Sequence, residues 1–198
     1  MTSSQYFESQ PAVPSKRREF ATAVDGISMR LLTDRGVFSQ DGLDPGTRAL
    51  LKLAPPPPAT GNLLDLGSGI GPIAINLALR SPDARVWAVD VNERANELCS
   101  ANAALNATAN VVVSAPDDVP DAMLLDQIWS NPPIRIGKVA MHEMLLRWFA
   151  RLTPEGTAVL VVHKHLGSDS LVKWLVGEGW PTERLTSYQG YRILQISR

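Results

Sequence analysis

Apolar residues fall into short runs that alternate with longer stretches of mixed polarity. Leu63, Leu64 and Leu66 form one such run, and after a glycine-rich turn the apolar positions of residues 73–79 have a spacing compatible with a helix packed on a sheet. Residues 85–90 form a second apolar run that ends in an acid. This order of strand, turn, helix and strand predicts a doubly wound unit with parallel strands.

The same alternation continues to the end of the chain and predicts an α/β fold. We expect strands at residues 63–66, 85–90, 111–113, 126–130, 158–162, 184–188 and 192–197. We expect helices at residues 49–53, 73–79, 93–105, 140–150 and 168–177, the first of them preceded by the N-cap Asp44 and by Pro45. The last two strands form a hairpin, so the predicted fold is a Rossmann-like, mostly parallel seven-stranded sheet with a terminal antiparallel hairpin strand.

The first part of the chain has a different character. Residues 1–32 are polar and include a basic run at residues 16–18. We expect a partly flexible N-terminal arm here, with one short helix or strand near residues 19–29. Residues 33–198 would then form the folded domain.

Composition limits the function classes. The chain has 198 residues, 44% of them hydrophobic and 20% charged, and it lacks both a secretory signal pattern and an apolar run of the roughly 18 residues that cross a bilayer. These features predict a cytoplasmic protein with no membrane partner. The net charge of −1 means that any nucleic acid must meet a local patch or be presented by a larger assembly. Nothing in the sequence indicates an oligomeric state.

Metal and thiol chemistry are not expected. His142, His163 and His165 have no acid or cysteine at ligand spacing, so we predict no metal site. Cys99 is the one cysteine, and its place in a predicted helix favours a buried structural thiol over a nucleophile.

The glycine turn is the first candidate for chemistry. Gly67, Gly69 and Gly71 stand between a strand and a helix, where a missing Cβ lets a ligand approach the free N–H groups of the helix. Asp90 ends the next strand, from which a carboxylate reaches ribose hydroxyls in doubly wound nucleotide-binding units. The spacing Gly-x-Gly-x-Gly, with Asp65 before it, differs from the dinucleotide fingerprint.

A second candidate site is Asn131-Pro132-Pro133-Ile134, which follows the strand at residues 126–130. Parallel strands bring this segment to the same sheet edge as the glycine turn. The prolines remove two backbone donors, so the Asn131 side-chain oxygen and the Pro132 carbonyl can both accept from a planar –NH₂ group. Alignment of such an exocyclic amine favours its methylation without a strong base.

Together these segments resemble the small-domain (MTS) family of class I methyltransferases, which use S-adenosylmethionine (SAM) and include ribosomal RNA small subunit methyltransferase C and single-domain relatives. The motifs lie within residues 34–198 and are Gly36-Val-Phe-Ser39, Leu43-Asp-Pro-Gly-Thr47, Leu64-Asp-Leu-Gly-Ser-Gly-Ile-Gly-Pro72, Val89-Asp-Val-Asn-Glu-Arg-Ala95, Ser130-Asn-Pro-Pro-Ile134, Leu152-Thr-Pro-Glu-Gly156 and Gly190-Tyr-Arg-Ile-Leu194. The resemblance implies methylation of the guanine N2 amine in small-subunit ribosomal RNA, as naked RNA or in the assembled subunit.

The resemblance also assigns residues to roles. The residues implied to bind SAM are Gly67, Ser68, Gly69 and Gly71 at the methionine part with Asp65 towards its amino group, Asp90 and Val91 at the ribose, Asp117 at the adenine amine, and Phe38 and Thr47 as a cover. Asn131, Pro132, Pro133 and Ile134 would hold the target amine.

Two departures from the family bear on the substrate. Ile134 stands where the family usually has Phe or Tyr to stack on a flipped base. The larger bacterial enzyme also carries an N-terminal domain, for which we expect no counterpart here. Two alternatives therefore stay open: a release-factor type glutamine methyltransferase, which presents an amide to a similar site, and a SAM-binding protein with a small-molecule substrate.

Overall fold

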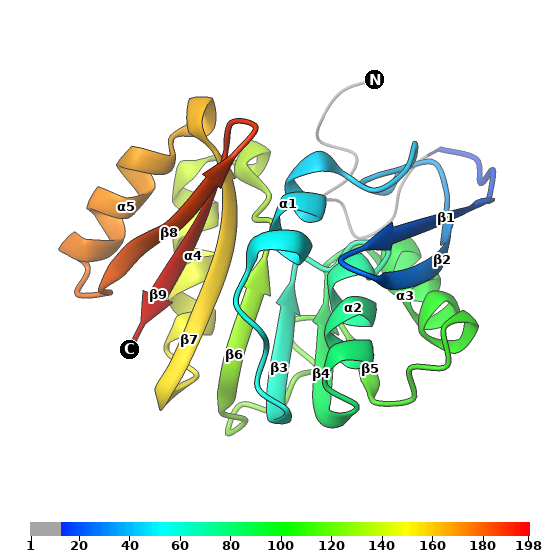
Figure 1. Cartoon of the computed structure of the whole chain (residues 1–198), viewed down its shortest axis with the longest axis horizontal. Coiled ribbons are helices and arrows are strands. Elements are labelled where there is room, and N and C mark those ends of the chain that lie inside the picture. The colour runs from blue at the N-terminus through cyan, green and yellow to red at the C-terminus, as the bar shows by residue number, and fades with distance from the viewer. Residues whose placement is uncertain (1–12) are drawn as a thin grey trace.

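A seven-stranded sheet runs through the centre of the molecule, in the order β5-β4-β3-β6-β7-β9-β8 (Figure 1). The computed structural model describes residues 13–198, apart from the side chain of Arg135. The strands of this sheet are β3 (Thr60–Leu66), β4 (Asp83–Val89), β5 (Val111–Ser114), β6 (Leu125–Ser130), β7 (Leu152–His163), β8 (Thr182–Tyr188) and β9 (Tyr191–Ser197). Strands β3 to β7 pair in parallel, whereas β9 is antiparallel to both β7 and β8. The predicted fold is confirmed.

Helices cover both faces of the sheet. One face carries α1 (Pro45–Leu53), α2 (Pro72–Arg80) and α3 (Glu93–Leu105), and the other carries α4 (Lys138–Phe149) and α5 (Ser168–Gly177) (Figure 1). Successive strand residues point to opposite faces. Leu63 accordingly packs in the first core and Leu64 in the second, and both are fully buried. Burial on both faces explains why the strands read as continuous apolar runs.

The N-terminal part differs from the expected arm with one short element. Its described residues contain a two-stranded antiparallel hairpin, β1 (Arg18–Val24) and β2 (Ile27–Thr33) (Figure 1). Met29 and Leu31 of this hairpin are buried in the same core as the helices of the first face. Residues 1–12 lie outside the described part of the chain, and the division into an arm and a domain at residue 33 stays a prediction.

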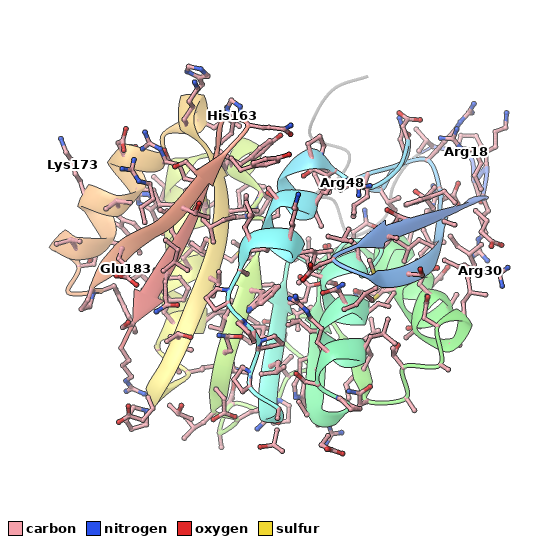
Figure 2. All side chains as sticks on the ribbon, in the orientation of Figure 1. Arg18, Arg30, Arg48, His163, Lys173 and Glu183 are labelled. Carbon is pink, nitrogen blue, oxygen red and sulfur yellow. The ribbon has the colours of Figure 1, made fainter. Side chains whose placement is uncertain are left out.

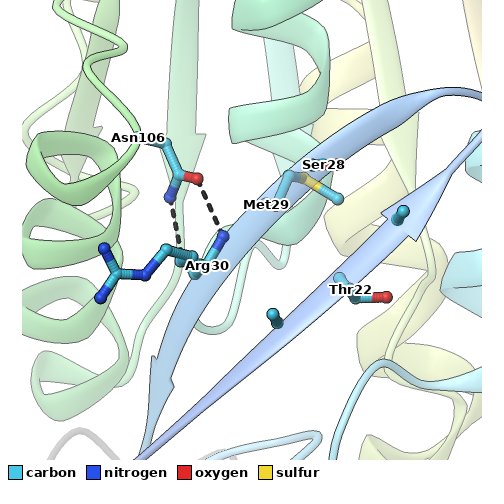
Figure 3. Close-up of a pocket in the computed structure, with 7 residues that line it drawn as sticks. Thr22, Ser28, Met29, Arg30 and Asn106 are labelled. Carbon is cyan, nitrogen blue, oxygen red and sulfur yellow. Dashed lines mark hydrogen bonds between the residues drawn. The ribbon is translucent and has the colours of Figure 1, made fainter.

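Side-chain amides of α3 hold the hairpin in place. The amide of Asn102 accepts from the Leu32 N–H at 2.6 Å and donates to the carbonyls of Leu32 and Ile70, each at 2.9 Å. One helical turn later, Asn106 accepts from the Arg30 N–H at 3.0 Å and donates to the Arg30 carbonyl at 2.7 Å (Figure 3). The two asparagines act as a substitute strand edge, because they pair with alternate residues of β2.

One further difference concerns an element boundary. The segment at residues 152–156, expected to lead into a strand, is itself part of β7, which has a register shift against β6.

Arg48 of α1 donates to the Ala23 carbonyl at 3.2 Å and the Thr22 hydroxyl at 3.0 Å, so it joins α1 to β1 (Figure 2). No helix within residues 13–198 has the length and apolar character needed to span a membrane.

Candidate active site

The loops after β3, β4 and β6 meet at the carboxyl edge of the sheet. The central strand β3 lies between β4 and β6. From β3 the chain continues through α2 to β4 on one side, and it reaches β6, on the other side of β3, only later. Open α/β sheets bind ligands at such a switch point. The structure brings the glycine turn and the Asn131 segment together here: a Cβ added to Gly67 would lie 3.8 Å from the Cδ atom of Pro133.

The outer side of the glycine turn is open. Gly67 and Gly69 have φ angles of 74° and 54°, in the left-handed region that favours glycine. A Cβ on Gly69 would find no described atom closer than the Cβ of Phe38 at 4.0 Å. A ligand can therefore approach the backbone of this turn closely, as the SAM assignment requires. Phe38 is 45% exposed and stands over this opening, in keeping with a cover.

At Gly71, by contrast, an added Cβ would point into the protein interior. The φ angle of Gly71 is 86°, and a Cβ there would lie 2.4 Å from the Cys99 sulfur. Cys99 is fully buried, and burial raises the pKa of its thiol, which matches the predicted structural role. The absence of a side chain at Gly71 therefore lets the start of α2 approach α3 closely. The predicted contact of Gly71 with the cofactor stays a prediction.

Asp90 anchors the glycine turn. Its carboxylate accepts from the Gly69 N–H at 2.8 Å with one oxygen and from the Asn92 N–H at 2.9 Å with the other. Burial raises the pKa of Asp90, while backbone hydrogen bonds from Asn92, Gly69 and Val91 oppose that rise. A carboxylate has about four lone-pair sites and these three hydrogen bonds use three of them, so Asp90 can still accept from a ligand hydroxyl. The neighbouring Val91 is 48% exposed and offers an apolar surface beside the carboxylate.

Two buried polar atoms under the turn have no hydrogen-bond partner among the described residues. Asp65 is fully buried; one carboxyl oxygen accepts from the Ala74 N–H at 2.9 Å and the other accepts nothing. Burial raises the pKa of Asp65 to about 8. The hydroxyl of Ser68 is the other such atom. A cationic ligand group above the turn would favour the ionised form of Asp65, so the residues present fit the amino group of SAM.

The Asn131 amide has a defined orientation. Its Nδ2 atom donates to the Asp44 carboxylate at 2.8 Å and to the Thr47 hydroxyl at 3.1 Å. A carboxylate accepts hydrogen bonds only, so the –NH₂ group must be the end that faces Asp44. The Oδ1 atom consequently faces away, and no described residue donates to it. The Pro132 carbonyl accepts from the Ile134 N–H at 2.8 Å and keeps its second lone pair.

A cavity of about 130 Å³ adjoins this segment. It is lined by Ile134, by Lys138 and His142 of α4, and by Leu166 and Ser170 near the start of α5, among others. Ile134 is the residue of the Asn131-Pro132-Pro133-Ile134 segment that lines this cavity.

The remaining predicted residues are less central. Thr47 is buried, and its hydroxyl accepts from the Asn131 amide. Its predicted role in covering the cofactor stays a prediction. The Asp117 carboxylate is exposed and forms an ion pair with Arg147 at 2.8 Å. Its predicted contact with adenine stays a prediction. Within residues 13–198, no three His, Cys, Asp or Glu side chains lie together in a way that could hold a metal ion.

Sequence reasoning missed the second role of Asp44, which it assigned only as a helix cap. The cap is present, since Asp44 accepts from the Thr47 N–H at 2.9 Å. The same oxygen also accepts from Asn131, 87 positions later in the chain. A long-range contact of this kind leaves no local signal, although Leu43-Asp-Pro-Gly-Thr47 was recognisable as a motif.

Comparisons with known proteins agree with this arrangement. The family model described as "Methyltransferase small domain" matches residues 28–195. The uncharacterized protein YbxB of Bacillus subtilis is 33% identical over 199 residues, which cover 99% of each chain. Ribosomal RNA large subunit methyltransferase G of Pseudomonas syringae is 35% identical over 73% of this chain, and ribosomal RNA small subunit methyltransferase C of Pectobacterium atrosepticum is 35% identical over 70%.

This chain spans 40% of the length of each of those two methyltransferases. A solved Thermus thermophilus structure, titled as the 16S rRNA N2 G1207 methyltransferase in complex with AdoMet and guanosine, superposes with a TM-score of 0.75. It is 24% identical, and the match covers 95% of this chain and 52% of that one. This likeness supports the fold. The family match spans most of the chain, and with the two motifs meeting at one sheet edge it leads to one conclusion: the chain belongs to the methyltransferase small domain family.

Proposed function

We propose that this chain methylates an exocyclic amine with SAM as donor, and that the amine is N2 of a guanine in small-subunit ribosomal RNA. The orientation of the Asn131 amide carries this proposal. Because Nδ2 donates to Asp44 and Thr47, Oδ1 is left to accept from a ligand. A site that offers oxygen acceptors beside the cofactor turn suits a planar –NH₂ group.

In this proposal the cofactor lies along the open side of the glycine turn. Gly67 and Gly69 would admit its methionine part, Asp65 and Ser68 would lie beneath it, and the Asp90 carboxylate would accept from its ribose. When bound, SAM supplies an electrophilic methyl group.

The residues of the chain then orient the substrate amine. The Asn131 oxygen and the free lone pair of the Pro132 carbonyl accept its two N–H groups, which directs the nitrogen lone pair towards the methyl group. Alignment of the reacting atoms supplies much of the rate. The neutral nitrogen would form its new bond to the methyl carbon as the carbon–sulfur bond breaks and S-adenosylhomocysteine leaves, and the extra proton would leave to water afterwards. No strong base is required, in keeping with a site built from acceptors.

The guanine assignment is supported by relatives and by the space beside Ile134. Related proteins are named as ribosomal RNA methyltransferases of the small and the large subunit, and the Thermus thermophilus title names N2 of a guanine. Base stacking on an aromatic ring is worth roughly 1–3 kcal/mol, and Ile134 cannot supply it. Trp129 and Trp148 are buried and cannot replace it. The cavity beside Ile134 would hold the base by packing and edge contacts, with lower ground-state affinity.

The test is transfer of labelled methyl from SAM into a ribosome-containing extract of a strain that lacks this protein, followed by digestion with nuclease or protease. We expect the label to become soluble after nuclease treatment and to lie in small-subunit RNA. Label that only protease releases would overturn the proposal in favour of a glutamine methyltransferase. Label in neither polymer, together with measurable SAM binding, would point to a small-molecule substrate.

A further inference from the structure

We infer that Asp44 and Thr47 are positioning residues that fix the Asn131 amide with its oxygen towards the target amine; the inference rests on the proposed function. The sequence places these residues in the motif Leu43-Asp-Pro-Gly-Thr47, before the glycine turn. The structure connects that motif to the amine site at two atoms, the Asp44 Oδ2 and the Thr47 Oγ1.

Fixing the amide matters because its two ends are nearly the same size and differ in hydrogen-bond sense. With Oδ1 outward, Asn131 accepts from an amine. With Nδ2 outward, it presents a donor to a donor, and the productive contact is lost. Both N–H groups of Nδ2 have an acceptor in the observed orientation, at 2.8 Å and 3.1 Å. Rotation by half a turn would place Oδ1 against the Asp44 carboxylate, where two acceptors repel.

The helix cap alone does not require aspartate. Serine, threonine and asparagine cap helices about as well, and their side chains would serve the Thr47 N–H. Asp44 is distinguished by one oxygen that reaches both the Thr47 N–H, at 2.9 Å, and the Asn131 amide, at 2.8 Å. The start of α1 is thereby tied to the loop after β6.

The C-terminal motif Gly190-Tyr-Arg-Ile-Leu194 supports this arrangement. Tyr191 packs closely on the start of α1, since a Cβ on Gly46 would lie 2.9 Å from the Tyr191 ring and 3.0 Å from the Asp44 carboxylate. The Tyr191 ring meets the ring of His163 edge-on at 5.0 Å between centroids. His163 lies at the end of β7, at the same edge of the sheet as α1 (Figures 1 and 2). Tyr191 thus packs against the start of α1, the part of the helix that carries Asp44 and Thr47.

The test compares variants that separate capping from positioning. Asp44→Ser keeps a good N-cap but shortens the side chain, and Asp44→Asn keeps an acceptor of the same reach. Thr47→Val removes one acceptor at nearly constant volume, and Thr47→Ser restores it. We expect Asp44→Ser to lower kcat about 10- to 100-fold, the range for loss of a hydrogen bond to a charged group, with melting temperature and SAM affinity nearly unchanged. Asp44→Asn should retain most of the turnover that Asp44→Ser loses, and Thr47→Ser most of the turnover that Thr47→Val loses.

A double-mutant cycle separates positioning from a structural role. In an Asn131→Ala background, Asp44→Ser should lower kcat no further, because the amide it positions is gone. Equal additional loss in that background, or a fall in kcat that follows the melting temperature, would overturn the inference.

A second readout needs no substrate. Nitrogen-15 NMR of the Asn131 side-chain –NH₂ should show slow hydrogen exchange in the wild type and faster exchange with a shifted signal in Asp44→Ser. An unchanged Asn131 signal in Asp44→Ser would overturn the inference. If the wild-type protein methylates no RNA, the proposed function fails, while this measurement still decides whether Asp44 and Thr47 hold the amide.

Discussion

Replacing Gly71 with alanine tests whether Gly71 serves helix packing while Gly69 leaves space for the cofactor. At a φ of 86°, an alanine costs about 1–2 kcal/mol of left-handed strain. Its Cβ would also lie 2.4 Å from the Cys99 sulfur and 3.4 Å from the Cys99 Cβ, in a fully buried site. Overpacking of this kind costs about 1–3 kcal/mol. We therefore expect Gly71→Ala to lower the free energy of unfolding by about 2–5 kcal/mol.

The matched variant is Gly69→Ala. Its φ of 54° carries a similar strain, but its Cβ would project into open space with the nearest described atom at 4.0 Å. We expect a loss of only about 1–2 kcal/mol in stability, together with a clear loss of SAM affinity, because the Cβ occupies ligand space.

The assay is urea unfolding followed by circular dichroism, with SAM affinity from calorimetry on the same samples. Adding Cys99→Ala to Gly71→Ala should restore about 1–3 kcal/mol relative to the sum of the single changes, since the clashing sulfur is gone. The reasoning is refuted if Gly71→Ala is no less stable than Gly69→Ala and instead loses SAM affinity, because Gly71 would then line the cofactor.

Three further predictions follow from the site. Asn131→Ala should leave SAM affinity nearly unchanged by calorimetry while removing most turnover; equal loss of both would show that Asn131 does not act on the amine. Asp90→Ala should weaken SAM binding by about 1.5–3 kcal/mol, and unaltered affinity would exclude the ribose contact. Burial raises the pKa of Asp65 from 3.8 to about 8, so its contribution to stability is full below pH 4 and is lost as the pH rises to 8. Relative to the wild type, Asp65→Asn should therefore gain stability from pH 5.5 to pH 8 in urea unfolding, and a constant or opposite difference would contradict the pKa.

The sheet and its helices were predictable because their signals are local. Burial on both faces gives β3 and β4 short, largely apolar runs, and the cap at Asp44 marks where α1 begins. The glycine turn and the Asn131 segment were placed at one edge by the rule that parallel strands share their carboxyl ends. The residues of these two motifs lie side by side in the structure.

The features that were missed depend on contacts between distant segments. The hairpin β1–β2 was missed although Ile27, Met29 and Leu31 alternate with polar residues along β2. Its attachment to the rest of the protein comes from Asn102 and Asn106, about 70 positions later. Asp44 looked complete as a helix cap, so its bond to Asn131 had no separate signal. Gly71 fitted a ligand-binding pattern by spacing, whereas its close neighbour, Cys99, comes from another helix.

The measurement that tests the central claim most directly is mass spectrometry of the nucleosides from RNA methylated by this chain with labelled SAM. In the proposed function the Asn131 oxygen and the Pro132 carbonyl hold an exocyclic amine, so we predict the label on N2 of guanosine. Label on a ring nitrogen, on carbon or on a ribose oxygen would contradict it, because those atoms offer no –NH₂ group for the two acceptors to hold.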